Sequence, residues 1–130
     1  MATTPVTLSI DGYQEREVQK ITYNFDQATD QEGQMSGICR GGHIQFKVKA
    51  LNDGNSELCA WMLERSLPKD GKVTFLETKT NKQMKTIEFK TAYCVDYTEE
   101  WVEGQMHTEV ITITCKEIAF GNVKFENQWK

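Results

Sequence analysis

The feature that most constrains this chain is a two-residue alternation of apolar and polar side chains that recurs in several segments. Successive side chains of a β-strand point to opposite faces, so this period predicts strands with one face in a core and the other in a wetter place. The apolar members are Val6, Leu8, Ile10; Ile21, Tyr23, Phe25; Ile44, Phe46, Val48, Ala50; Val73, Phe75; Ile87, Phe89, Tyr93, Val95, Tyr97; and Ile111, Ile113, Cys115. The chain is therefore predicted to be mainly β.

One segment in the middle of the chain has a helical period instead. The residues that recur at helical spacing are Leu58, Trp61, Met62 and Arg65. Asn55 or Ser56 can cap the start, and Pro68 ends any continuation. We expect one helix of about ten residues between strands, with Trp61 and Met62 packed on the sheet.

Short turn signals separate these elements. The tight-turn dipeptides are Asp11-Gly12, Asp53-Gly54, Asp70-Gly71 and Gly121-Asn122, and Lys79 to Lys82 is typical of a polar hairpin tip. No repeat, low-complexity stretch or linker interrupts the 130 residues. We expect one domain over residues 1–130, a length at which a single core is feasible.

Two connections are longer than hairpin turns need to be. Sixteen residues, Gln27 to Gly42, contain four glycines, and loops of this length in a compact domain are usually functional or disordered. The second connection, Thr98 to Thr108, is acidic and carries Trp101 and Met106. A tryptophan on a loop indicates a contact surface more often than a solvated tip.

Composition and charge exclude several classes of function. The net charge is −4 and the basic residues are scattered, whereas nucleic-acid binding needs clustered Lys and Arg. No segment approaches the roughly 18 consecutive apolar residues of a membrane helix, and residues 1–10 lack the features of a secretory signal. We expect a chain made in the cytosol that leaves the cell, if it does, without a signal peptide.

The cysteines and histidines give no sign of a catalytic or metal site. Cys39, Cys59, Cys94 and Cys115 form no CxxC pair or Cys/His cluster, and cytosolic thiols are usually reduced. A cysteine hydrolase would need His43 or His107 as its base, but no known local signature surrounds any cysteine. We expect no enzyme, no metal and no cofactor.

The sequence fits a calcium-binding loop poorly and a ligand-binding barrel only in part. Asp26, Asp30 and Glu32 do not follow the EF-hand spacing, since Ala28 occupies the third position. A lipocalin-like barrel needs eight long up-and-down strands, and the sequence predicts about seven with a helix between them. A small-ligand-binding β-barrel is therefore the less favoured interpretation of the strand pattern.

The order of these segments resembles one family. The segments that carry the resemblance are residues 23–30 (YNFDQATD) followed by Gly33, residues 41–44 (GGHI), residues 58–63 around Trp61-Met62, residues 89–95 (FKTAYCV), residues 111–114 (ITIT) and residues 126–129 (ENQW). Together they look like the Bacteroidetes branch of Hcp, the haemolysin-coregulated protein that forms the inner tube of the type VI secretion system. The match runs from about Val6 to Trp129. One departure is Gln34-Met35-Ser36-Gly37, where this branch would have a proline soon after Gly33.

The resemblance implies a structural protein. It implies a β-barrel of two packed antiparallel sheets with one short flanking helix and a long extended loop, assembled as hexameric rings stacked into a tube. Sheath and spike proteins and effectors in the channel are its implied partners, and it would be cytoplasmic during assembly and secreted on firing. The tube protein of a phage tail or of an extracellular contractile injection system shares this barrel and ring, so the resemblance is compatible with such a protein too.

These considerations together predict an interface and a core. We expect Gln31 to Arg40 to contact a neighbouring subunit or the next ring, because this segment combines apolar anchors, an arginine and glycines that permit close backbone approach. The predicted interface residues are Gln31, Gln34, Met35, Ile38, Arg40, Trp101 and Met106. The predicted core residues are Tyr23, Phe25, Phe46, Trp61, Met62, Phe89 and Tyr93.

Overall fold

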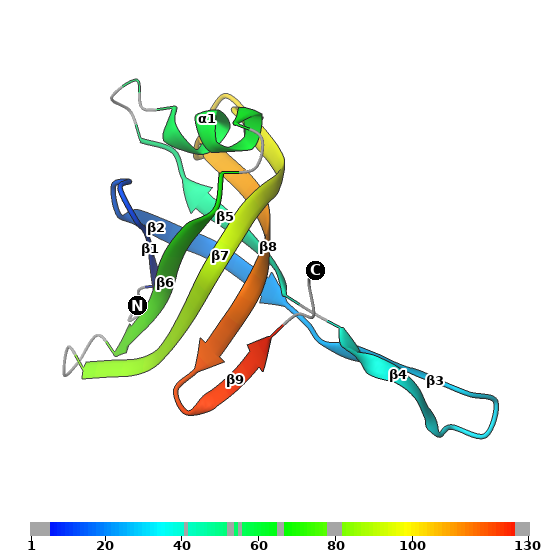
Figure 1. Cartoon of the computed structure of the whole chain (residues 1–130). Helices are drawn as coiled ribbons and strands as arrows, with labels where there is room; N and C mark the ends of the chain where they lie inside the picture. The colour runs from blue at the N-terminus through cyan, green and yellow to red at the C-terminus, as the bar shows by residue number, and fades with distance from the viewer. Residues whose placement is uncertain are drawn as a thin grey trace.

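The computed structural model describes residues 6–40, 42–51, 54, 56–64, 67–77 and 82–126, with the backbone alone for 26–29, 35–40, 77 and 82–84. The described part contains nine strands and one helix (Figure 1). In chain order they are β1 (Val6–Ile10), β2 (Arg16–Tyr23), β3 (Asp26–Thr29), β4 (Met35–Arg40), β5 (His43–Lys49), α1 (Glu57–Leu63), β6 (Lys69–Glu77), β7 (Lys82–Glu100), β8 (Thr108–Phe120) and β9 (Val123–Glu126).

Six antiparallel strands close into a barrel. The sheet order is β5-β2-β1-β6-β7-β8-β9, and β8 also pairs with β5, which closes the ring of strands. Two strands pair with the same edge of β8: β5 pairs with residues 108–114, and β9 pairs with residues 117–120. Closure gives each of the six barrel strands a neighbouring strand on both sides. The predicted β-barrel is confirmed, with one continuous closed sheet supplying both walls.

The barrel interior is filled by side chains. Phe46, Trp61 and Phe89 are fully buried and belong to one hydrophobic cluster, and Tyr23 packs against its margin. Met62 and Tyr93 are half-buried and lie outside this cluster. The aliphatic side chains that complete the cluster include Leu8, Ile10, Ile44, Val48, Leu58, Val73, Ile87, Ile111, Ile113 and Ile118. These side chains form the hydrophobic core of the barrel.

Bulges in β7 explain why the simple alternation fails along that strand. The register shifts between Cys94 and Asp96, and Lys90 and Thr91 of β7 oppose the single residue Asp70 of β6. Each extra residue reverses which face the following side chains occupy. Ala92 therefore faces the core, Tyr93 does not, and Val95 is exposed.

The first bulge places Thr91 in a strained conformation. Its φ is +52°, and it is the one non-glycine residue with positive φ among the residues described. A β-branched residue is disfavoured there, and the cost is partly offset because the Thr91 N–H donates to the Asp70 carboxylate at 3.0 Å.

Replacing Thr91 with glycine should therefore stabilise the protein. Relief of left-handed strain is worth about 1–2 kcal/mol and the added chain freedom costs about 0.5–1 kcal/mol, so the net gain should be up to about 1 kcal/mol. Urea unfolding followed by circular dichroism measures the change. The matched control is Thr98→Gly at an exposed, regularly paired position of β7, which should destabilise. A loss of stability in Thr91→Gly as large as in the control would contradict this explanation.

Helix α1 lies across one end of the barrel (Figure 1). Trp61 is 1% exposed, its ring meets Tyr13 edge-on at 6.3 Å between centroids, and its indole N–H donates to the Leu67 carbonyl oxygen at 2.8 Å. The helix is seven residues long and not ten, because the chain is already extended at Glu64. Ser56 is the N-cap residue but makes no side-chain capping bond, and Asn55 and Arg65 lie outside the described residues.

Two of the predicted turns are confirmed and one is wrong. Gly12, with φ +83°, turns the chain between β1 and β2, and Gly121, with φ +66°, turns it between β8 and β9. Gly71 instead lies inside β6, where a Cβ would meet Phe89 Cζ at 2.5 Å and the Ser9 carbonyl oxygen at 2.6 Å. The glycine is needed there for close approach and not for a turn. Asp53 and residues 78–81 lie outside the described residues.

Three of the four cysteines are described with their side chains, and none of these three forms a disulfide. Burial raises the pKa of Cys94 to about 11 and that of Cys115 to about 12. Cys59 is half-buried on α1. For Cys39 the structure describes the backbone alone.

These thiols give a prediction with two parts. Alkylation without reductant after unfolding should label all four cysteines, because a reducing compartment gives no driving force for disulfides. In the folded protein at pH 8, Cys94 and Cys115 should react far more slowly than in the unfolded chain, because the thiolate is the reactive form and their raised pKa suppresses it. Mass spectrometry of labelled peptides measures both parts. Two or no labelled thiols in the unfolded chain would contradict the first part.

Candidate assembly surfaces

Strands β3 and β4 form an arm that leaves the barrel (Figure 1). They pair with each other in a separate two-stranded sheet, with Asp26 opposite Arg40, Gln27 opposite Cys39 and Thr29 opposite Met35. The arm follows directly from β2 and returns directly into β5. The predicted long loop is thus a β-hairpin, and the segment without the expected proline begins β4. A proline inside that ladder would remove a backbone donor.

The tip of the arm, residues 30–34, is held by its own hydrogen bonds. The Asp30 carboxylate Oδ1 accepts the backbone N–H groups of Glu32 and Gln34, both at 2.9 Å. The Asp30 N–H donates to the Gln34 carbonyl oxygen at 2.8 Å, and the Gly33 N–H donates to the Asp30 carbonyl oxygen at 3.0 Å. Gly33 supplies the φ of +83° that this turn requires. The tip therefore presents the exposed side chains of Gln31, Glu32 and Gln34 on a fixed backbone.

An aromatic cluster fixes the root of the arm. Phe25 is 36% exposed and lies outside the core, contrary to the prediction, because β2 ends at Tyr23 and the alternation ends with it. The Phe25 ring lies 4.8 Å from the Phe125 ring and 5.8 Å from the Phe120 ring, between centroids. Tyr23 joins at 5.2 Å from Phe120. Strands β8 and β9 therefore brace the arm against the barrel.

The connection between β7 and β8, residues 101–107, carries exposed apolar side chains. Trp101 is 68% exposed, Met106 is 49% exposed, and Val102 is also exposed. The Gln105 N–H donates to the Val102 carbonyl oxygen at 2.9 Å, and Gly104 adopts a φ of +82°. The Ala50 N–H donates to the His107 carbonyl oxygen at 3.0 Å and ties the connection to the end of β5.

A chain of polar contacts runs from the barrel interior to this connection. Buried Arg16 forms an ion pair with buried Glu109, and its Nη2 also donates to the Lys49 carbonyl oxygen at 3.0 Å. The Tyr97 hydroxyl lies 2.6 Å from Glu109 Oε2 and 3.1 Å from Glu99 Oε1. Glu99 Oε2 in turn lies 2.6 Å from His107 Nε2.

The contacts of this network shift the pKa of Tyr97. Burial, and then the hydrogen bond to Glu109, raise the pKa of Tyr97 well above its ordinary value, so its hydroxyl keeps the proton it donates. One donor atom, Arg16 Nε, is buried without a hydrogen-bond partner among the described groups. The pair Arg16–Glu109 is a structural contact that joins β2 to β8, and the sequence contained no signal for it.

Two lysines lie opposite each other beside the connection. Lys20 on β2 is the register partner of Lys47 on β5, so both side chains leave the same face of the sheet. They line a hollow of about 400 Å³ together with Gln19, Glu100, Gln105, Met106 and Thr108. Like charges directly opposite each other destabilise a strand pair. Among the ion pairs between described residues, neither lysine takes part.

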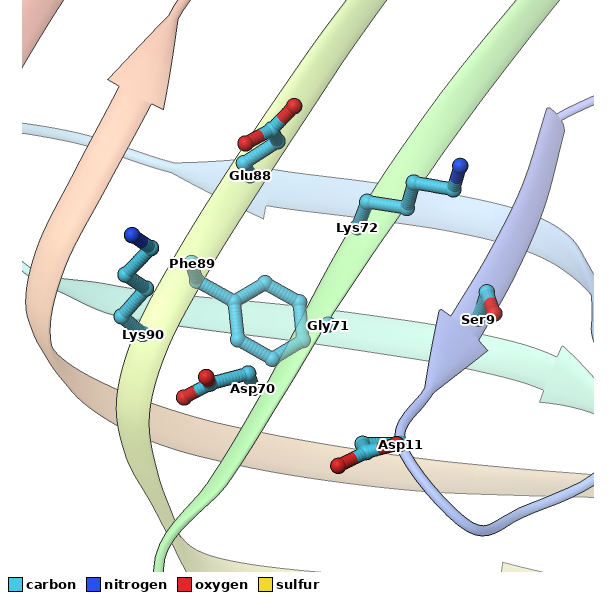
Figure 2. A pocket seen from close by; sticks show the side chains of 8 residues that line it. All are labelled: Ser9, Asp11, Asp70, Gly71, Lys72, Glu88, Phe89 and Lys90. Carbon is cyan, nitrogen blue, oxygen red and sulfur yellow. The ribbon is translucent and has the colours of Figure 1, made fainter.

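A second hollow, of about 430 Å³, lies over β1, β6 and β7 (Figure 2). Figure 2 shows Lys72, Glu88 and Lys90 standing along it, while the Phe89 ring extends from β7 toward Gly71 on β6. Asp70 is already engaged by the Thr91 N–H. Acidic and basic side chains alternate along this hollow and do not point toward a common centre. We therefore interpret it as a solvent-filled polar groove.

The predicted interface residues fall into two places. Gln31 and Gln34 are exposed on the tip, and Trp101 and Met106 are exposed on the connection, where Met106 lines the lysine hollow. Met35, Ile38 and Arg40 lie in β4, where the backbone alone is described. Glu32 lies within the predicted segment Gln31 to Arg40, whereas no pattern in the sequence indicated Lys20 and Lys47. Only the strand register, which pairs residues 27 positions apart, brings the two lysines together.

The described residues offer no group of three His, Cys, Asp or Glu side chains that could hold a metal ion. Asp30 and Glu32, considered above for calcium, lie on the tip, where the Asp30 carboxylate holds backbone N–H groups. None of the described helical residues forms a segment long and apolar enough to cross a membrane.

Comparison with known proteins points to one family. A family model described as hemolysin coregulated protein Hcp (TssD) matches residues 2–130. Comparison with curated protein sequences gave no match. Among solved structures, Hcp1 from Flavobacterium johnsoniae is 31% identical to this chain, with a TM-score of 0.86 over 95% of this chain and 99% of that one.

More distant structures share the fold. A mutant form of Hcp1 from the E. coli EAEC 042 pathovar is 13% identical, with a TM-score of 0.78 over 98% of this chain and 100% of that one. A chain from the sheath-tube complex of an extracellular contractile injection system, PVC, is 15% identical, with a TM-score of 0.55 over 91% of this chain and 88% of that one.

Proposed function

This chain belongs to the hemolysin coregulated protein family, Hcp (TssD), and from that membership we propose that it is a structural subunit of a type VI secretion inner tube. In this proposal six copies form a ring and rings stack into a tube. A sheath propels the tube behind a spike, and effectors ride in its channel. The chain assembles in the cytoplasm and is secreted on firing. The family is one of structural tube proteins and not of enzymes.

The observation that carries this proposal is the arm. It projects from the barrel, its root is braced by aromatic rings, and its tip is fixed by four hydrogen bonds from backbone N–H groups. Strands β3 and β4 pair only with each other, and a two-stranded hairpin alone is marginally stable, so the arm has stability to gain from a neighbour. A rigid projection of this kind is suited to contacts with another copy, because little conformational entropy remains to be lost on binding. The exposed Trp101 and Met106 offer further apolar contact area.

Removal of the arm tests the proposal. The wild type should form rings with the mass of six chains and stacks of rings, detected by native mass spectrometry and electron microscopy. Replacing Asp26–Arg40 with a short Gly-Ser linker should preserve the circular dichroism spectrum of the barrel, weaken stacking and abolish export by the assembled system. As a control, the same linker inserted at Gly54, an exposed residue between β5 and α1, should leave stacking intact. Normal tubes and normal export without the arm would show that the arm is not the stacking element.

A tube of an extracellular contractile injection system is the second candidate. The similarity to a chain of the PVC sheath-tube complex supports it, at 15% identity against 31% for Flavobacterium johnsoniae Hcp1. The greater similarity favours the type VI system. Co-purification of the assembled protein with a type VI sheath or spike, rather than with a free particle, would separate the two.

A further inference from the structure

The lysine pair carries an unbalanced charge. Lys20 and Lys47 stand opposite each other on the outer face of β2 and β5 and form no ion pair with another described residue. Glu100, which lines the same hollow, leaves one positive charge in excess. Two like charges directly across a strand pair cost stability unless an anion lies between them. The hollow beside them also contains the amide and hydroxyl groups of Gln19, Gln105 and Thr108.

The tip of the arm has the opposite charge. Residues 30–34 contain Asp30 and Glu32 and no basic residue. The Asp30 carboxylate is occupied by backbone N–H groups, whereas Glu32 is exposed on the fixed turn. Glu32 is thus a preorganised carboxylate, flanked by the amide side chains of Gln31 and Gln34.

The tip and the lysine hollow lie at opposite ends of the barrel. The arm leaves where β2 ends at Tyr23 and β5 begins at His43, whereas the hollow includes Thr108 and the connection before it, at the other end of β5 (Figure 1). The arm points away from the barrel and, at six strand residues, reaches roughly 20 Å. The tip therefore meets such a hollow only on another copy.

We infer that the arm tip of one copy docks in the lysine hollow of the next copy, with Glu32 between Lys20 and Lys47 and Met106 against the tip. This inference rests on the proposed function and names the contact that joins the copies. Contacts between two different surfaces of one chain are head-to-tail and repeat from copy to copy, which is the symmetry that stacked rings need. Charge complementarity also sets the register of the contact.

Charge reversal with compensation tests the contact. Glu32→Lys, and separately Lys20→Glu with Lys47→Glu, should each raise the protein concentration needed for stacking by about tenfold or more, because both place like charges together. The triple variant should stack at a lower concentration than either of these proteins, since the reversed charges are again opposite in sign, while Glu100 adds one more negative charge to its hollow. Sedimentation and electron microscopy of the purified full chain give these concentrations.

Matched controls change the same charges elsewhere. Glu88→Lys, and Lys72→Glu with Lys90→Glu, alter exposed residues of the polar groove in Figure 2 and should leave stacking near the wild-type concentration. A second measurement detects proximity directly. Chains carrying Glu32→Cys mixed with chains carrying Lys47→Cys should give a disulfide-linked dimer on mild oxidation, whereas Glu32→Cys mixed with Lys72→Cys should not.

The outcomes separate this contact from the proposed function. If the wild type stacks and both charge-reversed proteins stack equally well, the contact is wrong and the tube function stands. If the triple variant is no better than the others and the cysteine pair does not link, the lysines serve another partner and the contact is also overturned. If the wild type forms neither rings nor stacks, the proposed function fails and the contact fails with it.

Discussion

Replacing Trp61 with alanine should lower the free energy of unfolding by about 3–5 kcal/mol, as truncation of large buried aromatic side chains does. Trp61 is 1% exposed, packs edge-on against Tyr13 and donates to the Leu67 carbonyl oxygen, so the substitution opens a cavity and leaves that acceptor unpaired. Trp61 is one of the two buried side chains of α1, together with Leu58, so its loss should weaken the docking of the whole helix. The loss is a large share of the roughly 5–15 kcal/mol that stabilises a typical domain.

Thermal unfolding followed by circular dichroism measures this effect, with an expected drop in Tm of roughly 10 °C or more. The chain contains its own matched control in Trp101, which is 68% exposed. Trp101→Ala should change stability by no more than about 0.5 kcal/mol. Equal small shifts in the two variants would mean that Trp61 does not anchor α1 to the core.

Replacing Arg16 with methionine should also destabilise the protein by about 3–5 kcal/mol, because it leaves the Glu109 carboxylate buried without its partner. The Lys49 carbonyl oxygen would lose a donor in the same step. A double substitution tests this explanation. Arg16→Met combined with Glu109→Met should recover much of the loss, since two apolar groups of similar volume need no mutual compensation.

The control for this pair is on the surface. Lys124 and Glu117 are joined at 2.8 Å between β9 and β8, and both are solvent-accessible. Lys124→Met should change stability far less than Arg16→Met, because water compensates the remaining charge. Urea unfolding at pH 7 measures all the variants. If Arg16→Met and Lys124→Met were equally mild, the buried pair would contribute little to the barrel.

The barrel strands could be predicted from sequence because burial imposes a period of two. The segments Val6–Ile10 and His43–Lys49 follow that period along their whole length, and both are strands with one face in the core. Strand β7 departs from it, because its bulges depend on how β6 and β8 pair with it and not on its own residues. Phe25 was misplaced for a similar reason, since the strand ends two residues before it.

The candidate assembly surface could be predicted only in part. The length and glycine content of Gln27 to Gly42 indicated a functional segment, and Gln31 and Gln34 do lie on its exposed tip. The hairpin itself was missed because β3 and β4 form a separate two-stranded sheet outside the barrel wall, where the period imposed by the barrel core does not apply. The lysine hollow combines residues from β2, β5 and the connection after β7, and Arg16 and Glu109 are 93 positions apart. Contacts between residues so far apart in the sequence can be predicted only when the pairing register of the strands is known.

The way in which the arm joins the barrel has a mechanical consequence. Strands β2 and β5 carry the lysine pair, and at one end they continue into β3 and β4 of the arm. A pull on the tip of the arm therefore acts along the direction of these two strands (Figure 1). Ladder hydrogen bonds run perpendicular to antiparallel strands. A force along the strands therefore loads in shear, all together, the hydrogen bonds that join β2 to β1 and β5 to β8, whereas a force across the strands would open the bonds one after another. The barrel should therefore resist mechanical unfolding most strongly when the force acts along the direction in which the arm points.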